Sequence, residues 1–232
     1  MGLFISASGI IASFRRNDVT ANNIANLATP GFQASTALSV DAPGGGTFVG
    51  AVTRDSTPGP LEFTGAPLDL APESGFFRVT LPDGATAYTR SGHFGLNAQG
   101  QVVTSGGAQL EPPIAVPANA TSVTVLRDGT VNATVPGQLA PQVAGQIQVF
   151  QFPNPGGLSA LGNGLFRETG ASGAANPVST EAPVLSGALA GSNVDLSTEM
   201  VNSLINVHAA RANLNAFRAQ SDLLGELLNI TS

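Results

Sequence analysis

The sequence predicts a mixed α and β fold, with a helix at each end of the chain and a central all-β domain of short strands. Apolar residues recur at helical spacing in both terminal segments. Between them lie short β-like runs separated by turns. Most of the 28 Gly and 16 Pro also lie there, where they mark turns. A chain of 232 residues is long enough for one or two domains.

The N-terminal segment, residues 3–28, has the heptad spacing of a packing helix. Leu3, Ile10, Asn17 and Ile24 follow one another at intervals of seven, and Phe14 belongs to the row four residues on. This pattern predicts an apolar seam with one polar position. Pro30 and Gly31 end the helix.

The C-terminal segment, residues 194–230, has the same pattern. One row contains Leu196, Ser203, Ala210, Phe217 and Leu224, and the other contains Met200, Val207 and Leu214. Asp195 can cap the start of this helix, because its carboxylate can accept from the first free backbone N–H groups. A carboxylate in the first turn, here Glu199, also favours the helix dipole.

The middle of the chain, from residue 47 to about residue 189, contains repeated hairpin signals. Residues 76–81 and 87–90 flank a Pro-Asp-Gly turn, and residues 123–126 and 130–132 flank an Asp-Gly turn. Residues 146–152 alternate polar and apolar, as expected for one half-buried strand.

Two arrangements of the terminal helices fit these patterns equally well. The helices can pack on each other outside the β domain, with Asn17 and Ser203 setting their register. Alternatively, both can pack on the sheet of a single α+β domain.

Composition and charge exclude several classes of function. All nine basic residues are Arg, only two of them are adjacent, and the net charge is −6, so the chain lacks the clustered cations of a nucleic-acid binder. No segment is long and apolar enough to enter a membrane. The chain has no Cys and only two His, His93 and His208, neither within a catalytic or metal-binding motif. We therefore expect neither an enzyme nor a cofactor or metal site.

Three asparagines, Asn22, Asn23 and Asn26, lie close together at the end of the first helix. Asn is a mediocre helix former, because its amide competes for backbone hydrogen bonds. One Asn fits a polar helix face, but three in five positions favour an amide-lined interface with another chain.

The asparagine cluster, together with the following Thr29-Pro30-Gly31-Phe32, resembles the N-terminal signature of bacterial flagellar basal-body rod and hook proteins. The segment around Asn193, Asp195 and Met200 resembles the C-terminal motif of that family. The middle, including residues 75–77 and 88–90, looks like its β domain. The resemblance covers nearly the whole chain and is greatest with the distal rod members, although the segment at residues 38–49 is shorter than usual.

The resemblance implies a structural subunit of the flagellar rod that assembles into a helical tube and transmits torque across the periplasm. The terminal helices, residues 1–36 and 191–232, would form an inner coiled-coil core, and residues 37–190 an outer β domain. Partners would be copies of itself, other rod and hook proteins, the export apparatus and the ring proteins around the rod. The subunit would be exported from the cytoplasm without a cleaved signal.

The expected assembly interface combines apolar packing residues with polar ones. Its members are Leu3, Ile10, Phe14, Asn22, Asn23, Ile24, Asn26, Asn193, Asp195, Met200, Val207, Leu214, Phe217 and Leu224. A proximal-rod or hook-type paralogue remains an alternative within the family. The alternatives outside it are a secreted β-domain adhesin and an enzyme that uses His93.

Overall fold

A computed structural model describes residues 2–178 and 184–230 of the chain. The chain divides into two compact units, a helical unit and a β unit. The helical unit contains Met1–Leu27, Ala34–Asp55 and Val194–Ser232, and the β unit contains Ala28–Gln33 and Ser56–Asn193. Residues 37–55, expected in the central β domain, therefore group with the helices.

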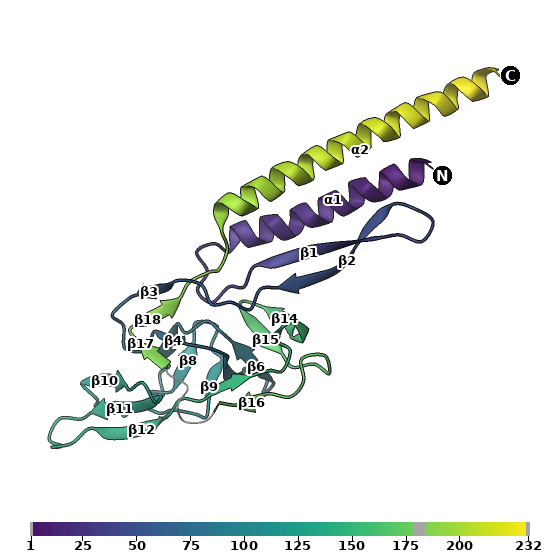
Figure 1. Ribbon diagram of the computed structural model, residues 1–232. Helices are drawn as coiled ribbons and strands as arrows, with labels where there is room; N and C mark the ends of the chain where they lie inside the picture. The colour runs from purple at the N-terminus through teal and green to yellow at the C-terminus, as the bar shows by residue number, and fades with distance from the viewer. Residues whose placement is uncertain (1, 179–183, 231–232) are drawn as a thin grey trace. The chain divides into compact units, whose positions relative to one another are not determined.

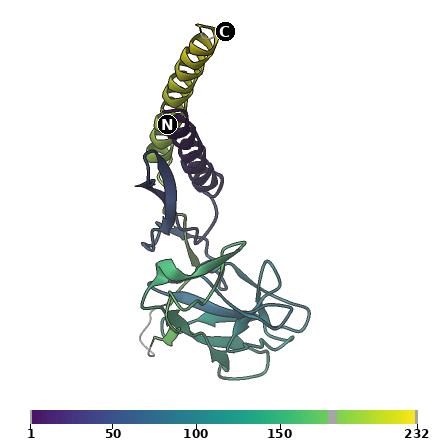
Figure 2. The same cartoon turned by 90° about the vertical axis from the view of Figure 1, so that its right-hand side faces the viewer.

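The helical unit consists of two helices and one hairpin (Figures 1 and 2). Helix α1 (Gly2–Ala25) lies alongside the first part of the longer α2 (Leu196–Ile230), and the two run antiparallel. The hairpin of β1 (Ser35–Asp41) and β2 (Thr47–Arg54) packs on α1. The prediction that the two helices pack on each other is thus confirmed.

The β1–β2 hairpin was not expected from the sequence, which suggested only a short connection at residues 38–49. Its turn uses Gly44, Gly45 and Gly46, all at positive φ, and a bulge follows Leu38. The pairing of Val40 with Phe48 places Leu38, Val40 and Phe48 on one face. All three side chains are exposed.

Within residues 56–178 and 184–193, the β unit contains one large sheet and three smaller ones. The nine-stranded sheet has the order β14-β15-β6-β5-β9-β8-β7, and β13 pairs with both β5 and β16. Its strands are β5 (Phe76–Thr80), β6 (Thr86–Thr89), β7 (Phe94–Leu96), β8 (Val102–Thr104), β9 (Gln109–Glu111), β13 (Val149–Gln151), β14 (Ser159–Gly162), β15 (Leu165–Arg167) and β16 (Asn176–Pro177). A 3₁₀ turn at Pro155–Gly157 precedes β14.

The smaller sheets are antiparallel throughout. One has the order β10-β11-β12, and the pairs β17–β4 and β18–β3 join the end of the β unit to its beginning. Their strands are β3 (Leu61–Phe63), β4 (Leu70–Pro72), β10 (Ser122–Val125), β11 (Thr130–Thr134), β12 (Gln142–Gln146), β17 (Val184–Ser186) and β18 (Ala188–Ala190).

Both expected hairpins, β5–β6 and β10–β11, are present. The single strand expected at residues 146–152 is instead two strands in different sheets. The break falls at Ile147 and Gln148, between β12 and β13. Ile147 donates its backbone N–H to Gly129 in the β10–β11 turn, so the chain changes sheets there.

Two apolar clusters fill the β unit, and β5 contributes to both. Phe77 and Val79 belong to the larger, mostly aliphatic cluster. Phe76 belongs to an aromatic cluster whose rings meet edge to face. The members of this second cluster are Phe76, Tyr88, Phe150, Phe152, Leu158 and Phe166. The alternation along β5 thus places the two clusters on opposite faces of the sheet.

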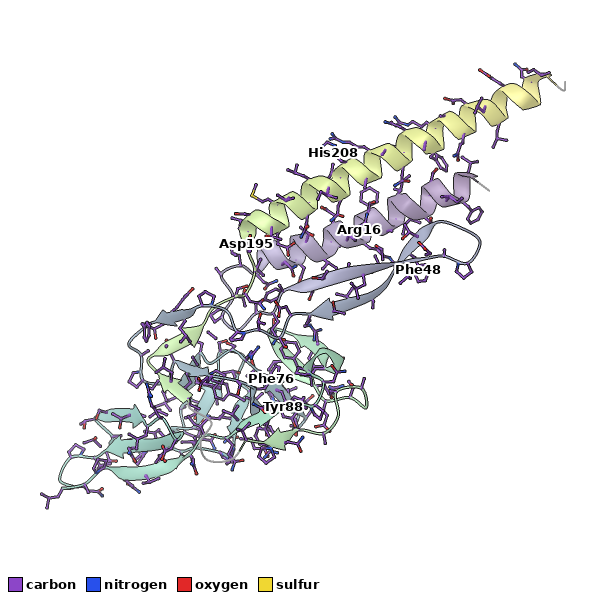
Figure 3. The ribbon with its side chains drawn as sticks, in the orientation of Figure 1. Arg16, Phe48, Phe76, Tyr88, Asp195 and His208 are labelled. Atoms are coloured by element: carbon purple, nitrogen blue, oxygen red, sulfur yellow. The ribbon has the colours of Figure 1, made fainter. Side chains whose placement is uncertain are left out.

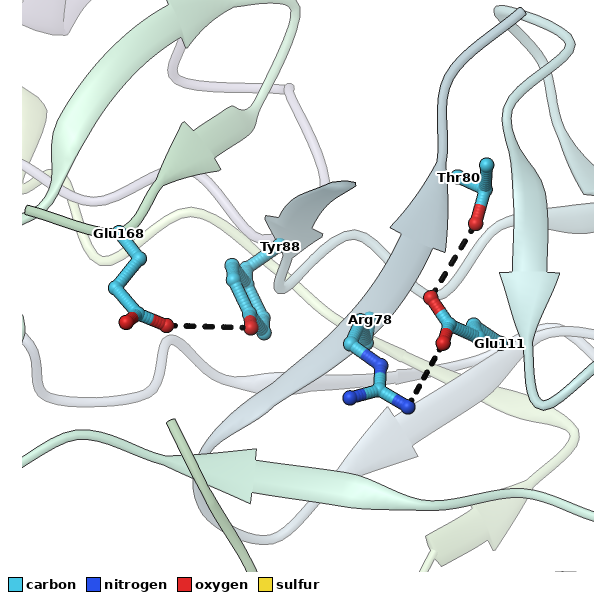
Figure 4. Close-up of polar contacts among 5 residues, drawn as sticks. All are labelled: Arg78, Thr80, Tyr88, Glu111 and Glu168. Carbon is cyan, nitrogen blue, oxygen red and sulfur yellow. Dashed lines mark hydrogen bonds and ion pairs between the residues drawn. The ribbon is translucent and has the colours of Figure 1, made fainter. Parts of the chain in front are cut away.

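Charged side chains border the aromatic cluster (Figure 4). Arg78 Nη2 lies 2.9 Å from Glu111 Oε1, and its guanidinium lies 4.4 Å from the centroid of the Phe150 ring. Tyr88 donates its hydroxyl to Glu168 Oε2 at 3.5 Å. Burial, together with the nearby charge of Glu168, raises the pKa of Tyr88 above its usual value.

We predict that the only tyrosine of the chain ionises at higher pH than a tyrosine in a model peptide, whose pKa is about 10. Spectrophotometric titration reports Tyr88 alone. The Glu168→Gln variant should titrate at lower pH than the wild type, because the substitution removes a negative charge that opposes the phenolate. An Asp83→Asn control, in an exposed turn, should leave the midpoint unchanged. A wild-type midpoint at or below 10 would contradict the prediction.

Candidate assembly interface

The contact between α1 and α2 is made largely by small and polar side chains. On α1, the buried residues are Ser6, Gly9, Ala12, Ser13, Thr20 and Asn23, and apart from Ala12 they follow one another at intervals of three, four or seven residues. Glu199 and Asn206 are buried on α2. A Cβ atom added at Gly9 would lie 2.7 Å from the Asn213 side chain, so glycine allows a close approach there.

Asn23 joins three elements of the helical unit. Its Nδ2 donates to Glu199 Oε1 on α2 and to the Ser35 carbonyl oxygen at the start of β1, both at 2.8 Å. Its Oδ1 accepts from the Ser35 N–H at 2.9 Å. The side chain is 1% exposed. Asn23 is therefore committed within the chain, where it fixes the end of α1 against the starts of β1 and α2.

Arg16 makes a second junction about two turns before Asn23 on α1 (Figure 3). Its guanidinium donates to Asn206 Oδ1 on α2 at 3.0 Å and to Ser39 Oγ on β1 at 3.2 Å. A third bond goes to Ser13 Oγ at 3.1 Å. Between these two junctions, Ser203 donates to Asn17 Oδ1 at 3.0 Å. The expectation that Asn17 and Ser203 meet is thus confirmed, and the polar bonds specify one helix register.

Several large apolar side chains lie outside this contact. Phe4, Ile11 and Phe14 are exposed on α1 at helical spacing, with Phe14 60% exposed. Met200, Val201, Leu204 and Ile205 form a similar exposed face on α2. Leu38, Val40 and Phe48 are also exposed, on the outer face of the β1–β2 hairpin. The exposed apolar residues of the helical unit are thus grouped on faces and are not scattered singly. Exposed apolar surfaces of this kind mark interaction sites.

The expected apolar rows therefore lie only partly in the contact between α1 and α2 within the chain, where Asn17 and Ser203 of those rows meet. Leu3, Ile10, Ile24 and Phe217 are half-buried, whereas Phe14, Met200, Val207, Leu214 and Leu224 are exposed. The physical reason is that a row of small residues lets two helix backbones approach more closely than the bulky row does. The spacing of Ser6, Gly9, Ser13 and Thr20 is the feature of the sequence that indicates this contact.

The remaining polar residues of the expected interface have local partners or are exposed. Asn22 is exposed, and Asn26 donates its Nδ2 to the Asn22 carbonyl oxygen at 2.9 Å. Asn193, in the β unit, donates to the Thr57 carbonyl oxygen at 3.0 Å.

Asp195 caps α2, as the sequence predicts. Its Oδ1 accepts from the Thr198 N–H, and its carbonyl oxygen accepts from the Glu199 N–H. The hydrogen bonds from Thr198 lower the pKa of Asp195 below its usual value. The cap is therefore in its charged form at neutral pH.

The two histidines lie far apart in the sequence and in different units. His93 Nδ1 lies 2.7 Å from Asp69 Oδ1 in the β unit, and His208 is exposed on α2. Among the residues that the structure describes, no group of three or more His, Asp or Glu could hold a metal ion. Within the same residues, no helix has the length and apolarity to cross a membrane.

Paired terminal helices with exposed apolar faces, attached to a separate β unit, define a structural subunit built for assembly. Comparison with known proteins agrees with this class. Residues 3–33 match the family model described as flagella basal body rod protein, and residues 73–133 match the D1 domain of flagellar hook protein FlgE/F/G.

Relatives that match most of the chain identify the family more specifically than these two family models. The flagellar basal-body rod protein FlgG of Caulobacter vibrioides is 38% identical over 88% of this chain and 89% of its own length. FlgG of Buchnera aphidicola subsp. Acyrthosiphon pisum is 36% identical over 97% of each chain. The flagellar basal-body rod protein FlgF of Escherichia coli is 32% identical over 92% of this chain and 91% of its own. The chain belongs to the flagellar basal-body rod protein family and is a structural subunit of the rod.

Family membership favours the structural role over the adhesin considered from the sequence. The relatives are rod proteins, a family of structural and not catalytic function. Membership of a family of rod proteins agrees with the exposed helix faces.

We predict that Asn23→Ala lowers the free energy of unfolding of the free protein by about 1–3 kcal/mol, because it leaves buried partners on Ser35 and Glu199 without a hydrogen bond. Denaturant unfolding followed by the helical signal measures the change. The matched control is Asn22→Ala, one position away and exposed, which should change stability by less than about 0.5 kcal/mol. Equal losses in the free energy of unfolding for the two variants would contradict the inference that the hydrogen bonds of Asn23 stabilise the helical unit.

Proposed function

We propose that this chain builds the distal part of the rod by helical self-assembly through the outward apolar faces of α1 and α2. The single observation that carries this proposal is the arrangement of the helix pair, with polar residues between the helices and apolar residues outside. A face carrying Phe4, Ile11 and Phe14 is unfavourable in water. It becomes favourable when neighbouring copies cover it.

The energetics support burial between subunits. Full burial of one Phe, Leu or Met side chain contributes about 1.5–3 kcal/mol. Several such residues per copy, repeated at every contact, can offset the entropy lost on association. A contact between two different surfaces of identical copies does not close on itself, so it propagates into a helical filament.

The proposed interface keeps the residues expected from the sequence where they are exposed or half-buried. Leu3, Ile10, Phe14, Ile24, Met200, Val207, Leu214, Phe217 and Leu224 would supply the apolar contacts. Asn22, Asn26, Asn193 and Asp195 would lie among the polar contacts around them. Asn23 would act indirectly, by holding the helices in the orientation that presents this surface.

The proposed place of action is the periplasmic part of the basal body, where the rod transmits torque. The subunit would reach it from the cytoplasm through the flagellar export apparatus and would then contact other rod and hook proteins and the surrounding rings. The absence of Cys suits an oxidising compartment, where a free thiol is a liability. The distal position is supported by relatives named FlgG at up to 38% identity, against 32% for the FlgF of Escherichia coli.

Electron microscopy of basal bodies from cells that lack this chain tests the proposal. Rods should be missing or truncated at the distal part, and expression of the chain should restore them. Complete rods in its absence would refute the distal position.

We predict that Phe14→Asp abolishes rod assembly and leaves the β unit folded. Phe14 is largely exposed in the single chain, so the substitution places a charge in the proposed contact without disturbing a core. Basal bodies are examined in cells where the variant is the only copy, and circular dichroism and Tyr88 titration check the fold. Phe217→Asp should also prevent assembly, but its half-buried position makes a defect in folding harder to separate.

The control for this prediction is Asn215→Asp, which adds the same charge to α2 at an exposed polar position outside the proposed contacts. It should assemble several-fold better than Phe14→Asp. Normal numbers of rods with Phe14→Asp would show that the apolar face is not the contact.

A further inference from the structure

The β unit contains an uncharged groove of about 720 Å³ between two outer strands. Its walls include Leu68, Leu96, Ala98, Pro117 and Val123, and none of its lining residues is charged. Leu96 belongs to β7, the last strand of the nine-stranded sheet, and Val123 belongs to β10, an outer strand of the three-stranded sheet.

The lining of this groove contains no charged residue, although Asp69 and His93 form a bridge just before β7 and Phe94 donates its N–H to the Leu68 carbonyl oxygen. The outer edge of a sheet has backbone N–H and C=O groups available for another chain, and proteins commonly protect such edges with charges or cover them. Here the protective charges are absent from the groove. A covering segment from outside the chain is therefore the simplest physical account of this surface.

The same unit carries a projection of matching chemistry. The β11–β12 hairpin ends in residues 135–141, which we call the hairpin tip, and none of them is charged. Leu139 in this tip is fully exposed. Pro136 and Pro141 restrict the tip, and Gln138 donates its N–H to the Val135 carbonyl oxygen at 3.2 Å. An ordered loop loses less conformational entropy on binding than a flexible one.

The tip does not occupy the groove of its own copy, since no tip residue is among those that line it. Each copy carries a net charge of −6, so copies repel one another at a distance and can meet most easily where both surfaces are uncharged. We propose that the hairpin tip of one copy docks in the groove between β7 and β10 of a second copy, with Leu139 as its apolar anchor. This inference rests on the proposed self-assembly, and it adds a contact between β units to the contact between helices.

Because the chain has no Cys, introduced cysteines are the only thiols with which it can form a disulfide. One copy carries Leu139→Cys and a second copy carries Ala98→Cys, and both are expressed in the same cells. Isolated basal bodies are then oxidised and separated by size under denaturing conditions. A disulfide requires Cα atoms within about 4.4–6.8 Å, so a covalent dimer reports direct docking.

The matched control replaces Ala98→Cys with Ala160→Cys, an exposed alanine on β14 at the other end of the large sheet. We expect a covalent dimer with Ala98→Cys and none with Ala160→Cys or with Leu139→Cys alone. Incorporation of both copies without a dimer would overturn the docking and leave the proposed function standing. Equal dimer yields with both alanine positions would overturn it too. Absence of the chain from basal bodies would overturn both proposals together.

A second variant tests the anchor in assembled rods. Leu139→Asp should prevent the cross-link and reduce the number of rods several-fold, and because Leu139 makes no core contact the β unit should remain folded. Leu126→Asp, in the exposed turn at the opposite end of β11, serves as its control. Equal numbers of rods for the two variants would show that Leu139 is not an anchor.

Discussion

The polar contact between α1 and α2 is the constraint on which the helical unit depends. An ordinary helix pair buries its largest apolar residues in the seam between the helices. Here the seam contains Asn23, Glu199 and Arg16, bonded to specific partners on other elements. Such bonds add modest net stability but are costly to leave unmade, so they select one register. That register leaves bulky apolar residues such as Phe4, Phe14 and Met200 outside.

This arrangement transfers much of the stabilisation from the chain to the assembly. In the helix pair alone, Phe4, Phe14 and Met200 are exposed and contribute no free energy of apolar burial. They contribute it only when neighbouring copies cover these side chains. The β unit differs, since its aliphatic and aromatic clusters are complete within one chain. Assembly through the helices therefore need not disturb the β unit, and the two units can serve different contacts in the same rod.

The sequence predicts the elements of this fold better than it predicts their contacts. The heptad rows located both helices, Asp195 marked the start of α2, and the Asp-Gly turns marked the hairpins β5–β6 and β10–β11. The β1–β2 hairpin was missed because three consecutive glycines resemble a linker more than a turn. The apolar rows do not separate contacts within the chain from contacts between copies, because hydrophobic periodicity identifies residues that are buried eventually but does not identify the chain that buries them.

The three asparagines illustrate the same limit in a smaller region. Their concentration at the end of α1 predicted an unusual demand for amide hydrogen bonds, and Asn23 meets such a demand within its own chain. Asn22 remains exposed next to it and is available to a neighbour. Composition can thus indicate that amides are needed at a position, whereas only the backbone geometry separates an internal junction from an external contact. In a subunit made for assembly the two can occupy adjacent residues, because the same helix end must hold its own fold and meet another copy.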